Sequence, residues 1–170
     1  MAAAHTSVPR WAPGVPAADP AARWLALVGL GARGEDVVGG WRSSAPPTVP
    51  VWAHTAPRAD DDALRRLAAE IGGARVGWRL MVAGPEVDVL AAMAGATRLG
   101  ALDAEIRAAV LDTGRRRVWC AHCRTTTETA RPVSGEASCR GCGRRLHVYA
   151  HVSRRLGAHL GSAADAEEVR

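Results

Sequence analysis

The sequence predicts an α/β protein that joins a small parallel sheet to a compact module held together by a metal ion. Strand-like and helix-like segments alternate between residues 22 and 112, and this order implies parallel strands connected by right-handed crossovers. After Gly114 the helical period disappears, and four cysteines follow in two close pairs. Paired cysteines in a segment with few apolar residues indicate a metal site in place of a hydrophobic core.

The composition allows one domain of ordinary size, or a modest domain with a small appendage. The chain has 170 residues, of which 48% are hydrophobic and 23% charged. It can therefore bury a core, and it is not a disordered, fibrous or repeat protein. Its longest apolar run falls short of the ~20 residues that span a bilayer, so no membrane partner is expected.

Residues 1–21 contain alanine and proline without a periodic pattern. Pro9, Pro13 and Pro16 would interrupt the apolar core that a signal peptide requires. We therefore expect a mobile N-terminal tail over residues 1–21 of a cytoplasmic protein, with Trp11 able to anchor part of it.

The first strand is expected at residues 24–28, where a short apolar run stops at a cluster of glycines. A polar loop containing glycine and proline should follow as far as Thr48. Residues 49–52 resemble a second strand, and Pro50 places it at a sheet edge or at a strand start.

A helix over residues 64–71 is expected next, because its apolar residues fall on one face and the acidic run Asp60–Asp62 can cap its start. Residues 76–83 form the clearest strand, which breaks at a Gly-Pro turn. Residues 87–98 then trace a second amphipathic helix. Residues 22–113 thus predict a small α/β domain of three or four parallel strands.

The positive charge of the chain is concentrated in the cysteine module. The chain has 22 basic residues, all arginine, and a net charge of +5. Residues 114–157 contain ten of these arginines but only two acidic residues, whereas the rest of the chain is slightly acidic. An arginine-rich surface attracts acidic partners, so we expect Arg144, Arg145, Arg154 and Arg155 to dock a partner protein.

Cys120, Cys123, Cys139 and Cys142 form the pattern C-x2-C-x15-C-x2-C. This spacing presents four thiolates to one tetrahedral ion, and Gly143 fits the turn after the second pair. Two disulfides would require an oxidising compartment, and a plant-type iron-sulfur cluster uses a different spacing. We expect a structural Zn²⁺ and a zinc ribbon over residues 114–152, with a rubredoxin-like iron as the alternative and a C-terminal tail over residues 153–170.

Two glycine motifs are candidates for cofactor binding. Gly29, Gly31 and Gly34 spell G-x-G-x-x-G after the first strand, a pattern that can bring backbone amides close to a pyrophosphate. Gly84 and Pro85 form the turn after the strand at 76–83. The segment after Gly34 shows no helical period, so a tight structural loop is the competing interpretation.

The run from Leu80 to Glu86, with the helix that follows, resembles the last strand and helix of the nicotinamide-binding domain of ferredoxin reductase-type flavoproteins. The resemblance implies a reductase-like (Rossmann-like) domain. Ala83 stands where those proteins usually carry cysteine, and the residues of this sequence upstream of the domain are too few for a flavin-binding barrel. The resemblance therefore implies a degenerate domain without reductase activity of its own.

A wider resemblance includes the cysteine module. The runs Gly77–Glu86, Val118–Cys123, Cys139–Gly143 and Tyr149–Gly161 are similar to the small DmmA-type subunit of bacterial dimethylamine monooxygenases. The resemblance implies partnership with a haem-containing N-demethylase subunit and with an NADPH-dependent reductase subunit that carries flavin and an iron-sulfur cluster. Such complexes convert dimethylamine and O₂ to methylamine and formaldehyde.

The residues themselves offer no nucleophile-base pair and no second metal cluster. We therefore expect an accessory, non-catalytic subunit that assembles or docks the reductase, with haem, flavin, iron-sulfur cluster and NADPH on partner subunits. A rubredoxin-like electron carrier and a nucleic-acid-binding zinc ribbon are the alternatives. Few aromatic residues lie near the ribbon to stack on bases, so nucleic acid is the less favoured partner.

Overall fold

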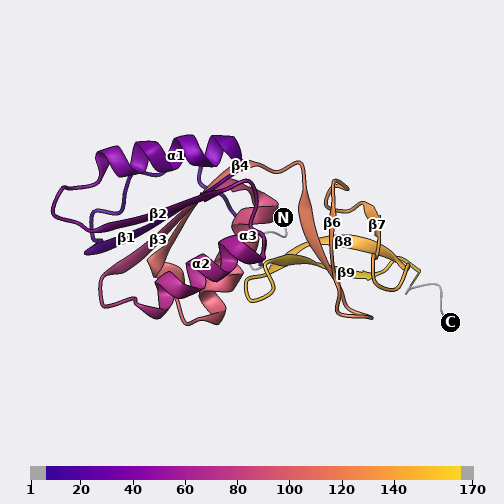
Figure 1. The fold of residues 1–170 in the computed structure, drawn as a ribbon. Coiled ribbons are helices and arrows are strands. Elements are labelled where there is room, and N and C mark those ends of the chain that lie inside the picture. Colours follow the sequence, from indigo (N-terminus) through magenta and orange to yellow (C-terminus); the bar gives the residue numbers. More distant parts are fainter. Residues whose placement is uncertain (1–6, 166–170) are drawn as a thin grey trace.

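A computed structural model describes residues 7–165 of the chain, and it contains two separate sheets that lie side by side (Figure 1). The elements are, in chain order, β1 (Trp24–Leu30), α1 (Gly31–Ser44), β2 (Val51–Ala56), α2 (Asp61–Gly72), β3 (Trp78–Pro85), α3 (Glu86–Arg98), the short 3-10 helix η1 (Asp103–Glu105), β4 (Ile106–Asp112), β5 (Arg116–Cys120), β6 (Thr126–Thr129), β7 (Glu136–Ser138), β8 (Arg145–Ser153) and β9 (Ala158–Ala163).

The first sheet has the order β2-β1-β3-β4, and all its strand pairs are parallel. Helix α1 covers one face, and α2 and α3 cover the other (Figure 1). Strands β1 and β3 are therefore buried on both faces, which explains their nearly continuous apolar sequences. The expected parallel sheet is confirmed, and so is the edge position of β2.

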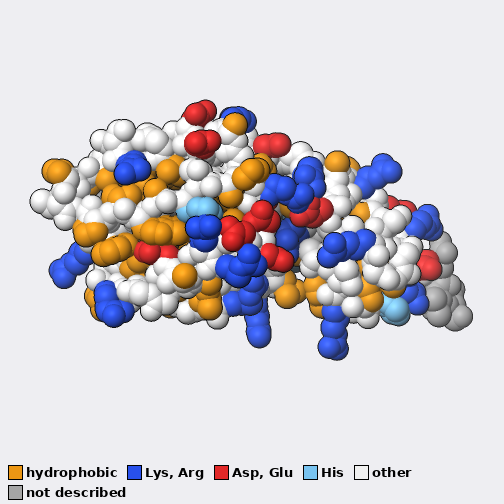
Figure 2. Space-filling view, viewed as in Figure 1, with side chains coloured by type: hydrophobic (Ala, Val, Ile, Leu, Met, Phe, Trp, Pro, Cys, Tyr) orange, Lys and Arg blue, Asp and Glu red, His pale blue; other side chains and the backbone are white. Residues whose placement is uncertain are grey.

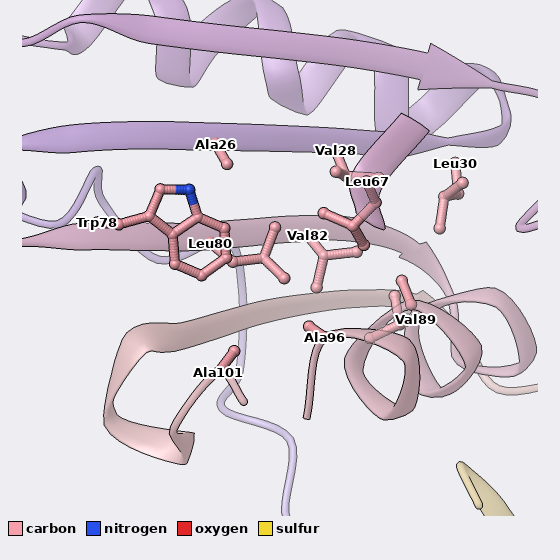
Figure 3. Close-up of a cluster of buried hydrophobic side chains, with 11 residues drawn as sticks. Ala26, Val28, Leu30, Leu67, Trp78, Leu80, Val82, Val89, Ala96 and Ala101 are labelled. Atoms are coloured by element: carbon pink, nitrogen blue, oxygen red, sulfur yellow. The ribbon is translucent and has the colours of Figure 1, made fainter. Parts of the chain in front are cut away.

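The core of the first sheet divides into two layers. Alternate residues of β1 and β3 meet α2 and α3 on one side, where Leu67 and Val89 point into the cluster drawn in Figure 3. The intervening residues meet α1 on the other side, where Val38 and Trp41 supply the contact. This alternation follows from the twofold side-chain period of a strand.

Helix α1 corrects the sequence-based expectation of a loop from Gly31 to Thr48. Gly34, Val38 and Trp41 recur at helical spacing and are all buried against the sheet. Each turn of this helix contributes only one buried residue, and its glycines add no apolar side chain. The sequence therefore shows little contrast between an apolar and a polar face. Contacts with β1 and β3 stabilise a helix that its own sequence does not predict.

The other two helices begin and end close to where the sequence indicates. The side chain of Asp60 accepts a hydrogen bond from the backbone N–H of Ala63 at 2.9 Å, which caps α2. Helix α2 ends at Gly72. Helix α3 follows the Gly-Pro turn directly and ends at Arg98.

The N-terminal segment is not a detached tail where the structure describes it. Trp11 donates its indole N–H to Glu86 Oε1 at 2.9 Å and packs against the α3 face of the sheet. On the opposite face, the buried carboxylate of Asp19 accepts from Arg107 Nε at 2.9 Å. These contacts correct the expected mobile tail for residues 7–21, whereas residues 1–6 of that tail lie outside the described residues.

The second sheet has the order β6-β5-β9-β8-β7. Its middle strand, β9, pairs in parallel with β5 and antiparallel with β8. The expectation of a C-terminal tail from residue 153 is therefore wrong for residues 158–163. The glycine at the middle of β9 and its polar neighbours give only a weak strand pattern, so pairing on both sides decides its structure.

Helix α3 joins the two sheets, since it packs against β5 and β9. The β8–β9 turn approaches it so closely that Gly157 has no room for a side chain, because a Cβ would lie 2.2 Å from Leu90 O. Arg98 Nη1 donates to Arg155 O at 3.1 Å across the same contact. None of the helices within residues 7–165 is both long and apolar enough to cross a bilayer.

Candidate metal centre

The second sheet brings the four cysteines together at one end. Cys120 ends β5 and Cys139 follows β7, and both are buried. Cys123 and Cys142 lie in the turns that come next and are partly exposed. The four Sγ atoms all lie within 4.8 Å of one another.

The distances between sulfur atoms fit a tetrahedral metal ion. Cys120 Sγ lies 3.9 Å from Cys142 Sγ, and Cys123 Sγ lies 3.5 Å from Cys139 Sγ. A tetrahedral ion with metal–sulfur bonds of about 2.3 Å places its ligands about 3.8 Å apart, close to both values. A disulfide would require about 2.05 Å. These residues could therefore hold one metal ion, and the cysteines are free thiols and not disulfides.

Two turns of the same design present the sulfur atoms. In the first, Cys120 N–H donates to Thr125 O at 3.0 Å, and Arg124 N–H donates to Cys120 O at 2.8 Å. In the second, Cys139 N–H donates to Arg144 O and Gly143 N–H donates to Cys139 O, both at 2.9 Å.

The residue after each pair of cysteines has a left-handed backbone. The φ angle is 62° at Arg124 and 73° at Gly143. Glycine adopts this conformation without strain, so the backbone angle accounts for Gly143; crowding does not, because a Cβ there would meet no atom within 4 Å. Arg124 adopts it at a cost, because its Cβ crowds the backbone.

Hydrogen bonds to sulfur favour thiolates at this end of the sheet. The Thr125 hydroxyl and backbone N–H donate to Cys123 and lower its thiol pKa from 9.0 to about 6. Burial opposes ionisation of Cys139, but N–H groups of Cys142 and Gly141 donate to its sulfur and lower its pKa.

The pKa of Cys142 shifts in the opposite direction from those of Cys123 and Cys139. The Arg144 N–H favours its thiolate, but burial and the three neighbouring cysteines raise its pKa to about 11. Without a metal ion the Cys142 thiol therefore keeps its proton at neutral pH, and metal binding must release that proton.

Two glycines that support the cysteines, Gly141 and Gly161, escape sequence reasoning. A Cβ at Gly141 would lie 2.5 Å from Thr125 Oγ1 and 3.1 Å from Cys123 Sγ, so the second turn closes over the first only because this residue is glycine. Gly161 in β9 lies beside Cys120, and its carbonyl accepts from Ala121 N–H at 3.0 Å. The pattern C-x-G-C could have indicated Gly141, whereas the role of Gly161 depends on a strand that the sequence does not predict.

The apolar core around the cysteines is small. It consists of Val118, Ala137, Leu146 and Val148, with the cysteines packed against them. Such a core is too small to stabilise a module of this length without a cross-link. This observation agrees with the expected need for a metal ion.

The glycine loop is explained by close packing. A Cβ at Gly34 would lie 2.6 Å from Ala83 O, and one at Gly29 would lie 2.6 Å from Gly34 O. Gly31 begins α1 with a φ of 71°. A Cβ at Gly84 would lie 2.7 Å from Leu30 O. These contacts let α1 lie directly on β1 and β3, which is one role of such glycines in nucleotide-binding folds.

Pro85 directly precedes α3, whose first turn is occupied by carboxylates of the chain itself. Glu86 and Asp88 are buried there. Asp88 accepts from Ala59 N–H at 2.9 Å, and burial raises its pKa. A phosphate at this helix start would face negative charge, so the geometry gives no support to a pyrophosphate at the Gly-Pro turn.

The structure separates the four arginines that were expected to dock a partner. Arg144 and Arg145 lie at the start of β8, near the cysteines, and Arg145 forms an ion pair with Glu136 at 3.3 Å. Arg154 and Arg155 lie at the other end of β8, where Arg154 forms an ion pair with Asp103. They do not form one patch, and their docking role stays a prediction.

Comparison with known proteins assigns the cysteine module. Residues 117–162 match the family described as "Dimethylamine monooxygenase subunit DmmA-like, C-terminal domain". The chain is also 39% identical, over 102 residues, to the heme-dependent oxidative N-demethylase delta subunit of Ectopseudomonas mendocina (strain ymp). That alignment covers 60% of this chain and 57% of the relative. No solved structure matches the chain.

Proposed function

The chain is a DmmA-like protein, and on this premise we propose that it is an accessory subunit of a haem-dependent oxidative N-demethylase. The reaction would remove a methyl group from a secondary amine with O₂ and NADPH, as in a dimethylamine monooxygenase. Haem would lie on the catalytic subunit, and NADPH, flavin and iron-sulfur cluster on a reductase subunit. The name of the relative supports a role as a subunit. The four-cysteine site supports a non-catalytic role, because four protein ligands fill a tetrahedral metal site.

Zn²⁺ is the metal that we propose for Cys120, Cys123, Cys139 and Cys142. An ion held by four thiolates has no open position for water or substrate, so it acts as a cross-link. Binding would contribute on the order of 10 kcal/mol to the folding of the ribbon. Reduced thiols agree with the cytoplasm as the compartment.

The α/β domain, which we place at residues 22–113, is in this proposal a reductase-like (Rossmann-like) scaffold that binds no nucleotide. Packing contacts of Gly29, Gly34 and Gly84 supply a reason for each glycine without a ligand. The buried carboxylates of Glu86 and Asp88 at the start of α3 favour the same reading.

Docking to the partners would use the two ends of β8. Arg144 and Arg155 have no ion pair among the described residues and are exposed, so they can meet acidic side chains of a partner. Arg145 and Arg154 are paired with acids of this chain. Charge of this kind steers association and selects partners more than it adds affinity.

One alternative keeps the same complex but assigns electron transfer to the ribbon. Cys123 and Cys142 are partly exposed, so an iron ion at this site would lie near the surface, as electron transfer requires. Metal analysis distinguishes the two: a colourless protein with one zinc equivalent supports the scaffold, and a red protein with one iron supports the electron carrier. Binding of nucleic acid is less well supported, because the ribbon arginines Arg115 and Arg145 pair with acids of this chain.

Co-expression with the neighbouring haem and reductase subunits, followed by affinity capture of this chain, tests the proposal. We expect both partners to be recovered, and we expect the double variant Arg144→Glu with Arg155→Glu to recover less of them. The matched control is Arg42→Glu, on α1 and away from the ribbon. Recovery of neither partner by the wild-type chain would contradict the proposal.

A further inference from the structure

A groove lies where the two sheets meet, and we call it the junction groove. It is a cavity of about 360 Å³ whose walls come from the loop after β2, from β5 and β6, and from the second cysteine turn. Its lining residues are Arg58, Arg117, Thr126, Thr127, Glu128 and Arg140. These residues are far apart in the sequence, so the groove exists only because α3 holds the sheets together.

Positive charge exceeds negative charge in and around the groove. Three arginines and one glutamate line it, and Arg98, Arg115 and Asp88 act electrostatically on the same groups. Glu128 is already paired, since it accepts from Arg58 Nη2 at 2.7 Å and from Arg115. Figure 2 shows basic and acidic side chains gathered between the two parts of the molecule. In the part of the chain that the structure describes, neither Arg117 nor Arg140 forms an ion pair with a carboxylate.

Arg117 lies half-buried in the groove, and within the described range 7–165 only its Nε has a hydrogen-bond partner. Its Nε donates to Gly157 O at 3.0 Å, which fixes the side chain and leaves both Nη groups for another acceptor. Burial lowers its pKa, and Glu128 opposes this effect while Arg98 and Arg140 reinforce it. Arginine nevertheless remains charged at neutral pH. A half-buried cation beside like charges is stabilised when an anion binds.

Thr127 adds a buried hydrogen-bond donor to the same groove. Only 8% of its surface is exposed. Its Oγ1 accepts from Arg140 N–H at 3.0 Å, so its hydroxyl proton is free to donate, and no acceptor for it is found among residues 7–165. The hydrogen bond also holds Arg140 beside the groove, because it ties β6 to the second cysteine turn.

We propose that the junction groove binds the phosphate group of a small molecule. Arg117 and Arg140 supply planar guanidinium donors and Thr127 supplies a hydroxyl, a set that suits a tetrahedral oxyanion. The depth of Arg117 and the concave shape favour a small ligand over the flat surface of a protein. The inference does not depend on the proposed function, because it concerns this chain alone.

Isothermal titration of the full, zinc-loaded chain at low ionic strength tests the proposal. Inorganic phosphate and ribose 5-phosphate serve as probes. If ribose 5-phosphate binds more tightly than inorganic phosphate, the natural ligand is a phosphomonoester and not the free ion. We expect one site, and we expect Arg117→Gln and Arg140→Gln each to weaken binding at least tenfold, as loss of a charge-assisted hydrogen bond does. Thr127→Val removes the hydroxyl with little change of volume and should weaken binding about fivefold.

Arg42→Gln is the matched control, since it removes one exposed positive charge from α1. It should change affinity less than about twofold. Metal content and circular dichroism of each variant check that the ribbon is intact. If Arg140→Gln loses its metal, the affinity of Arg117→Gln alone is used to test the proposal. Three results would overturn the proposal: no binding at about 10 mM phosphate, equal weakening by the control, or a glutamate-rich peptide that binds more tightly than both probes.

Discussion

Replacing Gly157 by alanine tests the contact between the β8–β9 turn and α3. Gly157 has a φ of 57°, and a Cβ there would lie 2.2 Å from Leu90 O and 2.9 Å from Ala94 Cβ. Leu90 O belongs to the backbone of the buried helix α3, so it cannot move aside as a flexible side chain could. The left-handed conformation costs alanine about 1 kcal/mol relative to glycine, and the forced separation adds about 2 kcal/mol. The free energy of unfolding should therefore fall by about 3 kcal/mol.

Gly143→Ala provides the comparison that isolates the packing cost. Its φ is 73°, and no atom lies within 4 Å of the added Cβ, so only the backbone cost of about 1 kcal/mol applies. In a chain of this size each kcal/mol lowers the melting temperature by about 2–4 °C. We expect losses of about 6–12 °C for Gly157→Ala and about 2–4 °C for Gly143→Ala.

Thermal unfolding followed by circular dichroism, at matched zinc content, measures the difference. Equal losses for the two variants would refute the reasoning, because they would mean that the turn does not rest on α3 as described. A Gly157→Ala protein that keeps its zinc but loses stability would locate the damage at the contact between the sheets, not at the metal centre.

Three further predictions concern separate parts of the molecule. Removing the metal with a chelator, or replacing Cys139 by serine, should unfold the ribbon and leave the helical signal of the α/β domain, as measured by circular dichroism. Burial lowers the pKa of His159 below its ordinary 6.5; the unfolded chain therefore binds its proton first, and stability should fall as the pH drops below about 6.5. His159→Gln should flatten that part of the profile in urea unfolding at pH 5 and pH 7.5, and an unchanged profile would count against it. Asp19→Asn should cost about 3 kcal/mol in urea unfolding, because it leaves the arginines at 2.9 and 3.6 Å without their carboxylate, and a loss below 1 kcal/mol would contradict the described packing of the N-terminal segment.

The strands and helices that the sequence predicted well are those with dense apolar patterns. β3 and α3 carry such patterns, and the run Asp60–Asp62 identifies the start of α2. Helix α1 was missed because Gly34, Gly39 and Gly40 weaken its period, although Val38 and Trp41 are buried on one face. A helix of this kind is stabilised by the sheet that it covers, which no local pattern records.

The cysteine site was predictable because its ligands follow a fixed spacing, whereas its surroundings were not. β9 was missed, and with it the support that Gly161 gives to Cys120. The N-terminal segment was expected to be mobile, although Trp11 could be named as its anchor. The junction groove escaped altogether, because Arg58, Arg117 and Arg140 come together only when the two sheets are in contact.

The central position of β9 has a consequence for the order in which the ribbon can form. Both cysteine turns precede β9 in the chain, yet β5 and β8 pair with β9 and not with each other. During synthesis the four thiolates are therefore available before the strand that completes the sheet between them. Early metal capture would shorten the loop that the late strand must close, and so lower the entropic barrier of a pairing with large sequence separation. Refolding of the ribbon should accordingly be faster when the metal is present from the start than when it is added last.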